Sequence, residues 1–255
     1  CLPDRLQRQV ALLDARPDVA VVGTLMAGMD AGGRHTVVMG RTLDNYGVFV
    51  GSLLLELTPV CHPSVMFRRE IVASVGGYDE SFAPAEDVEL WTRLALRRQT
   101  AYVIPELLMR SRMHERQQSV TQAAVQRRQI RRAQQRLIGA LYAGEGRRGV
   151  SRLLSMDTAF WAEYRSREAL ARVCTTLREL LTAIRIELKL SEGEWTALVR
   201  MIDRWLGPGV RLAPQLAHWP PPLFYGALGL LSPLMVPKVR LIRPHSKACF
   251  CIPGR

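Results

Sequence analysis

The sequence is poor in cysteine, and its cysteines form no familiar pattern. Five of them are scattered along 255 residues, at positions 1, 61, 174, 249 and 251. An odd and dispersed set argues against a disulfide framework and against a Cys-x-x-Cys metal knuckle. We therefore expect the protein to work in a reducing compartment, the cytoplasm.

Other common features are also missing. No signal-peptide pattern, internal repeat or low-complexity tract is evident. No Gly-x-Gly-x-x-Gly follows an expected strand, so the pair Gly76-Gly77 is interpreted as the end of a helix and not as a phosphate loop. The chain starts with Cys and not Met, from which we expect a start that is truncated or processed.

Positive charge is abundant but confined to one half. The formal net charge is +12. Residues 1–120 carry 13 basic and 14 acidic side chains, whereas residues 121–255 carry 22 and 9. This balance makes nucleic acid or an anionic membrane surface plausible partners of the second half. The hydrophobic content of 48% allows one substantial core.

Apolar periodicity divides the chain into two parts. In residues 1–118, expected helices at 2–16, 70–75 and 86–98 alternate with strands at 19–24, 35–40 and 63–69 and with extended segments at 100–114. The apolar stretch at 45–57 fits a helix or a strand, and its length favours a helix. This order is typical of an α/β layer. The first helix should bury Leu2, Leu6, Val10 and Leu13. Residues 119–255 show helical spacing with almost no strand signal up to about Leu206, so we predict a domain boundary between residues 118 and 119.

Several spaced blocks of the first part occur in the order seen in a known enzyme family. They are Pro-x-Arg-Leu, His-Pro-Ser-x-Met-Phe-Arg-Arg, Gly-Gly-Tyr-Asp-Glu, Glu-Asp-x-x-Leu-Trp and Arg-x-His. Over about residues 1–120 the chain resembles the later part of the catalytic domain of the inverting family-2 glycosyltransferases. The resemblance implies a partial GT-A fold followed by a mainly α-helical region. It also implies sugar transfer, in polysaccharide biosynthesis, from a nucleotide-sugar donor to a glycan or lipid-linked acceptor.

The Glu86-Asp87 pair lies in the first turn of an expected helix. Acidic residues at that position oppose the positive end of the helix dipole and are common for that reason alone. The resemblance gives the pair a second interpretation, in which Asp87, with Glu86 beside it, is the general base that deprotonates the acceptor hydroxyl. A positioned base of this kind contributes about 10²–10⁴-fold to the rate.

The resemblance implies roles for five further residues, each with a simpler alternative. His114 matches a position that in some members belongs to the divalent metal site, for Mn²⁺ or Mg²⁺, or it is a surface histidine. Arg112 faces donor phosphate or is an ordinary exposed arginine. His62 and Arg68, at the two ends of the expected strand 63–69, lie near the acceptor cleft, or His62 is a packed polar residue. Trp91 stacks on the acceptor or belongs to the core.

One element of the family is missing. In many members an Asp-x-Asp motif, which holds the metal and the donor diphosphate, stands shortly before the Pro-x-Arg-Leu helix, and this sequence has no substitute for it. A diphosphate needs a bound cation or an Arg/Lys clamp to balance its charge. We therefore expect this chain to be the C-terminal portion of a longer transferase and not to turn over alone.

The second part begins with an arginine-rich helix. Arg127 and Arg131, and also Arg128, Arg132 and Arg136, follow one another at spacings of four. These residues form either a solvated basic face or a surface for anionic lipid headgroups, where each basic residue contributes about 1 kcal/mol. Nucleic acid is the weaker interpretation, because no aromatic residues are interleaved for base stacking.

Near the end, no charged residue occurs from Pro220 to Pro237. That length is the lower limit for a spanning helix, and the prolines argue against a straight one. The segment is a monotopic anchor at the inner face of the membrane, a buried core segment or a span. The leading hypothesis is thus a glycosyltransferase, and the alternative is a non-catalytic membrane-associated or scaffolding protein that retains a transferase-like half-domain.

Overall fold

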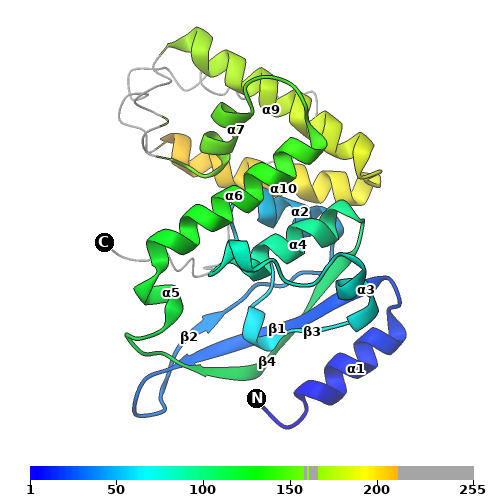
Figure 1. The fold of residues 1–255 in the computed structure, drawn as a ribbon, viewed down its shortest axis with the longest axis vertical. Helices are drawn as coiled ribbons and strands as arrows, with labels where there is room; N and C mark the ends of the chain where they lie inside the picture. The colour runs from blue at the N-terminus through cyan, green and yellow to red at the C-terminus, as the bar shows by residue number, and fades with distance from the viewer. Residues whose placement is uncertain (158–159, 161–165, 212–255) are drawn as a thin grey trace, which may run out of the picture.

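The fold is built around one long strand. The computed structural model describes residues 1–157, 160 and 166–211. Strand β1 (Val19–Met29) pairs in parallel with β4 (Thr100–Arg112) along its whole length. The other edge of β1 is shared by two antiparallel partners, β3 (Met66–Phe67) beside residues 21–22 and β2 (His35–Met39) beside residues 26–29. The result is the mixed sheet in Figure 1.

Helices lie on both sides of this sheet. α1 (Arg5–Ala15) packs on one face and shares a small core with residues of β1 and β4. α2 (Tyr46–Leu54) and α4 (Glu86–Leu96) lie on the other side (Figure 1). A strand covered on both faces needs a near-continuous apolar run, which is what β1 has. Most of the elements expected in residues 1–118 are therefore present, within a few residues of their predicted bounds.

Two of those expectations are wrong in detail. Leu6 and Val10, predicted to be buried, are 51% and 47% exposed. Gln9 is buried instead, because its amide nitrogen donates to the carbonyls of Val22 at 3.0 Å and Ser64 at 2.8 Å. Leu13 is buried as predicted, so the face of α1 that meets the sheet contains Gln9 and Leu13 in place of the full apolar stripe.

The strand predicted at 63–69 is also mostly absent. Of residues 63–69, only the two residues of β3 pair with β1, and residues His62–Ser64 before them form the 3₁₀ helix η1. Pro63 has no backbone N–H to offer to a sheet ladder, which explains why pairing starts late. The next helix, α3 (Arg69–Ser74), ends at Gly76 and Gly77, whose φ angles of +91° and +68° confirm the predicted helix end.

The second part of the chain is helical where it is described. Its helices are α5 (Gln118–Thr121), α6 (Ala123–Leu141), α7 (Arg147–Leu154), α9 (Arg167–Glu187) and α10 (Glu192–Arg211). α6 crosses α4, and α10 lies against α2. One apolar core contains Val103 of β4, Trp91 of α4, Leu137 of α6 and Leu198 of α10. The boundary predicted between residues 118 and 119 falls inside α5, and the apolar core is continuous across it, so a division into two domains stays a prediction.

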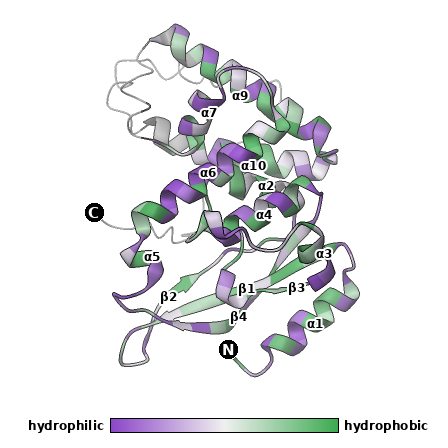
Figure 2. Cartoon of the chain, viewed as in Figure 1, coloured by the Kyte–Doolittle hydropathy of each residue, from purple (hydrophilic) through white to green (hydrophobic). Residues whose placement is uncertain are grey.

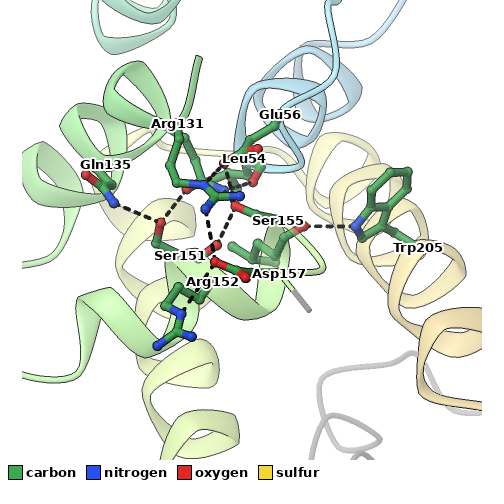
Figure 3. Close-up of polar contacts among 11 residues, drawn as sticks. Leu54, Glu56, Arg131, Gln135, Ser151, Arg152, Ser155, Asp157 and Trp205 are labelled. Atoms are coloured by element: carbon green, nitrogen blue, oxygen red, sulfur yellow. Dashed lines mark hydrogen bonds and ion pairs between the residues drawn. The ribbon is translucent and has the colours of Figure 1, made fainter. Parts of the chain in front are cut away.

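A half-buried polar cluster joins these helices to the end of α2 (Figure 3). The Arg131 guanidinium pairs with the Glu56 carboxylate and the Asp157 carboxylate, each at 3.0 Å. Ser155 donates its hydroxyl to Glu56 at 2.5 Å. The cluster therefore connects α6 and the end of α7 to the segment that follows α2.

The predictions about the membrane fall mainly on residues that the structure does not describe. The segment 220–237, and with it the expected anchor, lies outside the described residues. Along the ribbon, α6 shows both hydrophilic and hydrophobic stretches (Figure 2). None of the described helices combines the length and the apolar character needed to cross a membrane.

Candidate functional site

The Glu86-Asp87 pair begins α4, as predicted, after a loop that comprises residues 79–85. Within this loop the carboxylate of Asp79 accepts a hydrogen bond from the backbone N–H of Ser81 at 3.0 Å, capping the 3₁₀ helix η2 (Glu80–Phe82). The Asp87 side chain is 14% exposed. One carboxylate oxygen of Glu86 is buried without a hydrogen-bond partner among the described residues. Both carboxylates are therefore more enclosed than ordinary helix-start acids.

Side chains from three separate segments meet at this helix start. His62 comes from η1, Tyr78 from the turn after α3, and Asp87 from α4. The His62 Nδ1 atom lies 3.9 Å from Asp87 Oδ2, and its Nε2 atom lies 3.0 Å from the Tyr78 hydroxyl. The side chain of His62 and the whole of Tyr78 are each 40% exposed. The cluster is thus open to solvent on the side of the histidine and the tyrosine.

The electrostatics of the cluster separate a base from a donor. Burial raises the pKa of the Asp87 carboxyl, against the opposing influence of His62 and the Val88 backbone N–H, and the Glu86 charge raises it further. Burial also raises the pKa of the Tyr78 hydroxyl, and the negative charges of Asp87 and Glu86 add to this shift. At neutral pH Tyr78 is therefore protonated and able to donate, while the Asp87 carboxylate is a stronger base than an exposed aspartate.

Trp91 lies behind this cluster. Its ring is fully buried, and it meets the His62 ring edge-on with centroids 6.4 Å apart. The core alternative of the sequence analysis therefore describes its position. Stacking on an acceptor needs an exposed ring face, which Trp91 does not have, so any influence on substrate would pass through His62.

Arg68 and Arg112 are not part of the cluster. Both guanidinium groups instead donate to backbone carbonyls. The Arg68 guanidinium donates to Leu13 at 2.5 Å and to Val19 at 3.0 Å, which ties the end of α1 to β1. The Arg112 guanidinium donates to Ala31 at 2.9 Å in the turn between β1 and β2. These contacts attach both arginines to backbone near the ends of β1, and Arg112 remains exposed. The binding of substrate expected for the two arginines stays a prediction.

The predicted metal ligand stands apart as well. His114 follows β4 and is exposed. Within residues 1–157, 160 and 166–211 no group of three or more His, Cys, Asp or Glu side chains is placed to hold a metal ion. Mn²⁺ and Mg²⁺ need several converging oxygen or nitrogen donors. The described residues alone do not fit the expected metal, and no chemical step below depends on one.

Sequence reasoning missed Tyr78. The Gly-Gly-Tyr-Asp-Glu block contains this tyrosine but does not by itself assign it a role. A usable signal was its position, directly after the two glycines that end α3 and nine residues before Asp87. An aromatic residue that carries a hydroxyl in such a connecting loop is a reasonable candidate for a binding site.

A polar cavity of about 240 Å³ lies elsewhere and contains none of these residues. Two internal ion pairs, Arg16–Asp18 and Arg98–Glu194, both at 2.8 Å, already neutralise much of its lining charge. It opens among residues that begin β1, α2, β4 and α10, namely Arg16, Asp18, Asp44, Asn45, Tyr46, Arg98, Thr100 and Glu194.

Comparison with known proteins points to one class of enzyme. The chain is 26% identical over 112 residues to the amylovoran biosynthesis glycosyltransferase AmsE of Erwinia amylovora, covering 44% of this chain and 41% of that protein. It is 26% identical over 127 residues to an uncharacterized glycosyltransferase of Haemophilus influenzae, covering 48% of this chain and 46% of that protein. The chain thus spans under half the length of these two relatives.

No protein-family model matches the chain, and no solved structure matches it significantly. The mixed sheet flanked by helices is compatible with part of a nucleotide-sugar transferase domain. The two relatives support a glycosyltransferase family for this chain, and the fold is compatible with it.

Proposed function

We propose that this chain is part of a glycosyltransferase that moves a sugar from a nucleotide-sugar donor to a hydroxyl of a glycan acceptor, with inversion and with Asp87 as the general base. The observation that carries the proposal is the Asp87 carboxylate, largely enclosed at the start of α4 yet next to the solvent-facing pair His62 and Tyr78. The two relatives support the class of reaction. The role of Asp87 is supported by the Glu-Asp-x-x-Leu-Trp block and by this geometry.

The proposed step is a single displacement. The acceptor oxygen attacks the anomeric carbon while Asp87 takes the proton of the hydroxyl. The bond from the anomeric carbon to the diphosphate oxygen breaks, and its electron pair leaves with the nucleoside diphosphate. A carboxylate whose pKa is raised by burial is better matched to this task than an exposed one. The helix start keeps its ionised form accessible.

His62 and Tyr78 complete the acceptor side of the proposed site. The separation of 3.9 Å between His62 Nδ1 and Asp87 Oδ2 is longer than a normal hydrogen bond, so it leaves the carboxylate free to accept from a substrate hydroxyl. The neighbouring imidazole and phenol offer further polar atoms that could orient that hydroxyl.

The test compares Asp87→Asn with Glu86→Gln in the complete polypeptide of the reading frame, and Glu70→Gln is the control. Transfer is measured over a panel of nucleotide sugars with Mn²⁺ or Mg²⁺ in the buffer. Asparagine keeps the size of the side chain but cannot take a proton, so kcat should fall about a hundredfold or more while the donor still binds. Glu70→Gln removes an exposed acid from the first turn of α3 and should change kcat less than twofold.

Two results would count against the assignment. If Asp87→Asn keeps the wild-type rate, Asp87 is only a helix-start residue. If Glu86→Gln abolishes transfer and Asp87→Asn does not, the base is Glu86.

A membrane surface and a lipid-linked acceptor stay predictions. Three of the five arginines predicted to form a basic face, Arg131, Arg132 and Arg136, already bond to other parts of the chain. This leaves less free charge on α6 than the sequence indicates.

A further inference from the structure

One stripe of α6 is bonded to loop 79–85, the segment that leads into Asp87. Gln126 donates its side-chain amide to the Pro84 carbonyl at 3.0 Å. Gln129 and Arg132 both donate to the Ser81 carbonyl, at 3.2 Å and 3.1 Å. Spacings of three or four residues place all of these side chains on one side of the helix. Side chains of α6, in the helical part, therefore donate hydrogen bonds to backbone carbonyls of loop 79–85, in the α/β part.

A residue of the same stripe also contacts Phe82, the only aromatic residue of this loop. The Arg132 guanidinium lies over the Phe82 ring, 4.0 Å from its centroid. Phe82 itself is buried. A cation over an aromatic face adds attraction to the hydrogen bond that Arg132 already makes. Arg132 thus holds both the backbone and a side chain of the loop.

Arg136, one turn further along, reaches α4 itself. Its guanidinium pairs with the fully buried Glu89 carboxylate at 2.5 Å and lies 3.8 Å from Asp79. Arg93 Nε donates to both carboxylate oxygens of Glu89, and the Nη1 and Nη2 atoms of Arg93 donate to the carbonyls of Val75 and Gly77. A continuous chain of charged contacts therefore runs from α6 through α4 to the residue directly before Tyr78.

We propose that α6 is a positioning element of the candidate active site, in which Arg132 and Arg136 hold the loop so that Tyr78 and Asp87 meet at His62. The interpretation rests on the proposed function in so far as it takes Asp87 as the base. It replaces the solvated or lipid-facing role predicted for these two arginines. A displacement of about 1 Å at a catalytic group can cost about a hundredfold in rate, so this support matters although α6 touches no reacting atom.

The experiment compares Arg132→Ala with Arg128→Ala in the complete polypeptide. Both variants remove one exposed arginine from the same helix, and the two positions are one turn apart. In the described part of the chain Arg128 has no hydrogen bond or ion pair, so it controls for the loss of charge. Amide hydrogen exchange is followed in peptides covering residues 78–88 and, as a check on the fold, residues 19–29.

We expect exchange in residues 78–88 to be at least about tenfold faster in Arg132→Ala and within twofold of wild type in Arg128→Ala, with residues 19–29 unchanged in both. In transfer assays Arg132→Ala should lower kcat at least about tenfold with the donor KM within about twofold. Loss of folded protein would also lower kcat at constant KM, so kcat is compared only where residues 19–29 exchange as in wild type. Equal behaviour of the two variants overturns the proposal. Faster exchange with unchanged kcat also overturns it, because the loop would then be held for no catalytic purpose.

Gln129→Ala provides a second route if Arg132→Ala does not fold. It removes only a neutral donor to Ser81 and leaves every charged pair intact, and the same two readouts apply to it. The exchange comparison needs no assumption about the base. If Asp87→Asn retains activity, the assignment of Asp87 as the base fails, whereas the contact between α6 and the loop is still judged by hydrogen exchange.

Discussion

At the scale of single residues, Asp87 stands between influences of opposite sign. The backbone N–H of Val88 and the His62 ring favour its ionised form, but burial outweighs them and raises its pKa above the ordinary value of 3.8. A folded state with the higher pKa binds the proton more tightly than the unfolded chain does. Folding stability therefore falls as the pH rises from about the ordinary value through the folded pKa. At neutral pH the ionised carboxylate weakens the fold.

This leads to a prediction about stability that is independent of activity. Asp87→Asn should raise the melting temperature at pH 7, because it removes an ionised group that burial disfavours. The gain should shrink as the pH is lowered toward 4, where the native carboxyl becomes protonated. Scanning calorimetry of the two proteins between pH 4 and pH 8 would measure it.

The ordinary explanation of a helix-start acid gives the opposite sign. Removing a carboxylate that only opposes the helix dipole costs about 0.3–1 kcal/mol. Glu70→Gln, at an exposed position in the first turn of α3, shows what that loss looks like in this protein. An Asp87→Asn protein that melts below wild type at pH 7, as Glu70→Gln should, would refute the burial argument.

Tyr78→Phe tests the residue that sequence reasoning missed. The phenol contact to His62 is one neutral hydrogen bond of 3.0 Å, worth about 0.5–1.5 kcal/mol. If Tyr78 orients the imidazole or the acceptor, kcat/KM should fall about 3- to 10-fold, while the melting temperature falls by no more than about 6 °C. Tyr102→Phe is the matched control, since the Tyr102 hydroxyl has no hydrogen bond within the described residues. Equal kinetics in both variants would remove Tyr78 from the site.

Which site residues could be predicted depends on what each one needs from the rest of the chain. Short local blocks of the sequence mark Asp87 and His62, and the structure brings their side chains within 3.9 Å of each other. The carbonyls that Arg68 and Arg112 bind lie in segments distant in sequence, so no local pattern predicts these contacts. The partner of a long, flexible donor is decided by the fold and not by its neighbours along the chain.

At the scale of elements, α2 and α10 come unusually close. A Cβ atom built on Gly47 would lie 1.9 Å from the backbone carbonyl oxygen of Glu194, so only glycine allows this approach. Arg98 pairs with the Glu194 carboxylate at 2.8 Å and covers the Tyr46 ring, which strengthens the same junction. The first turn of α2 therefore determines where α10 can lie.

Gly47→Ala should accordingly be costly. The methyl group forces α10 away from α2, and overpacking of this kind costs about 1–3 kcal/mol or more, which urea unfolding would detect as a lower midpoint. Gly193→Ala adds the same methyl group to α10 at a position with no atom within 4 Å. That variant should be neutral or gain up to about 1 kcal/mol. If both variants unfold at the same urea concentration, the close contact does not exist in solution.

The elements themselves were largely predictable, and the exceptions have physical causes. The apolar run of β1 and the two glycines after α3 are local sequence patterns, and the structure contains the strand and the helix end that they predict. The orientation of α1 was wrong because Gln9 satisfies two backbone carbonyls that no local pattern reveals. The strand at 63–69 is shorter than predicted. Alternation of apolar and polar residues cannot show how much of the antiparallel edge of β1 is available for pairing, and β3 occupies only residues 21–22 of that edge.

At the scale of the whole molecule, the uneven charge of the chain is partly resolved by contact between its two parts. Arg131 of α6 pairs with Glu56 at 3.0 Å, and Arg136 pairs with Glu89 at 2.5 Å. A count of charges along the sequence assigns these arginines to an external partner. The fold shows that acidic side chains of the first part take up a share of that charge, which a sequence count cannot show.

The same contacts bear on whether the chain is one folding unit or two. The apolar core includes side chains from the sheet, from α6 and from α10, and Arg136 holds a carboxylate that is fully buried in α4. Separating the parts would expose that core and leave Glu89 short of a partner, which is strongly unfavourable. We therefore expect β1 and α9 to unfold together in urea, with coincident midpoints in pulse-labelled hydrogen exchange of residues 19–29 and 173–187. Two midpoints separated by more than about 0.5 M urea, with α9 the less stable, would instead support the domain boundary at residues 118 and 119.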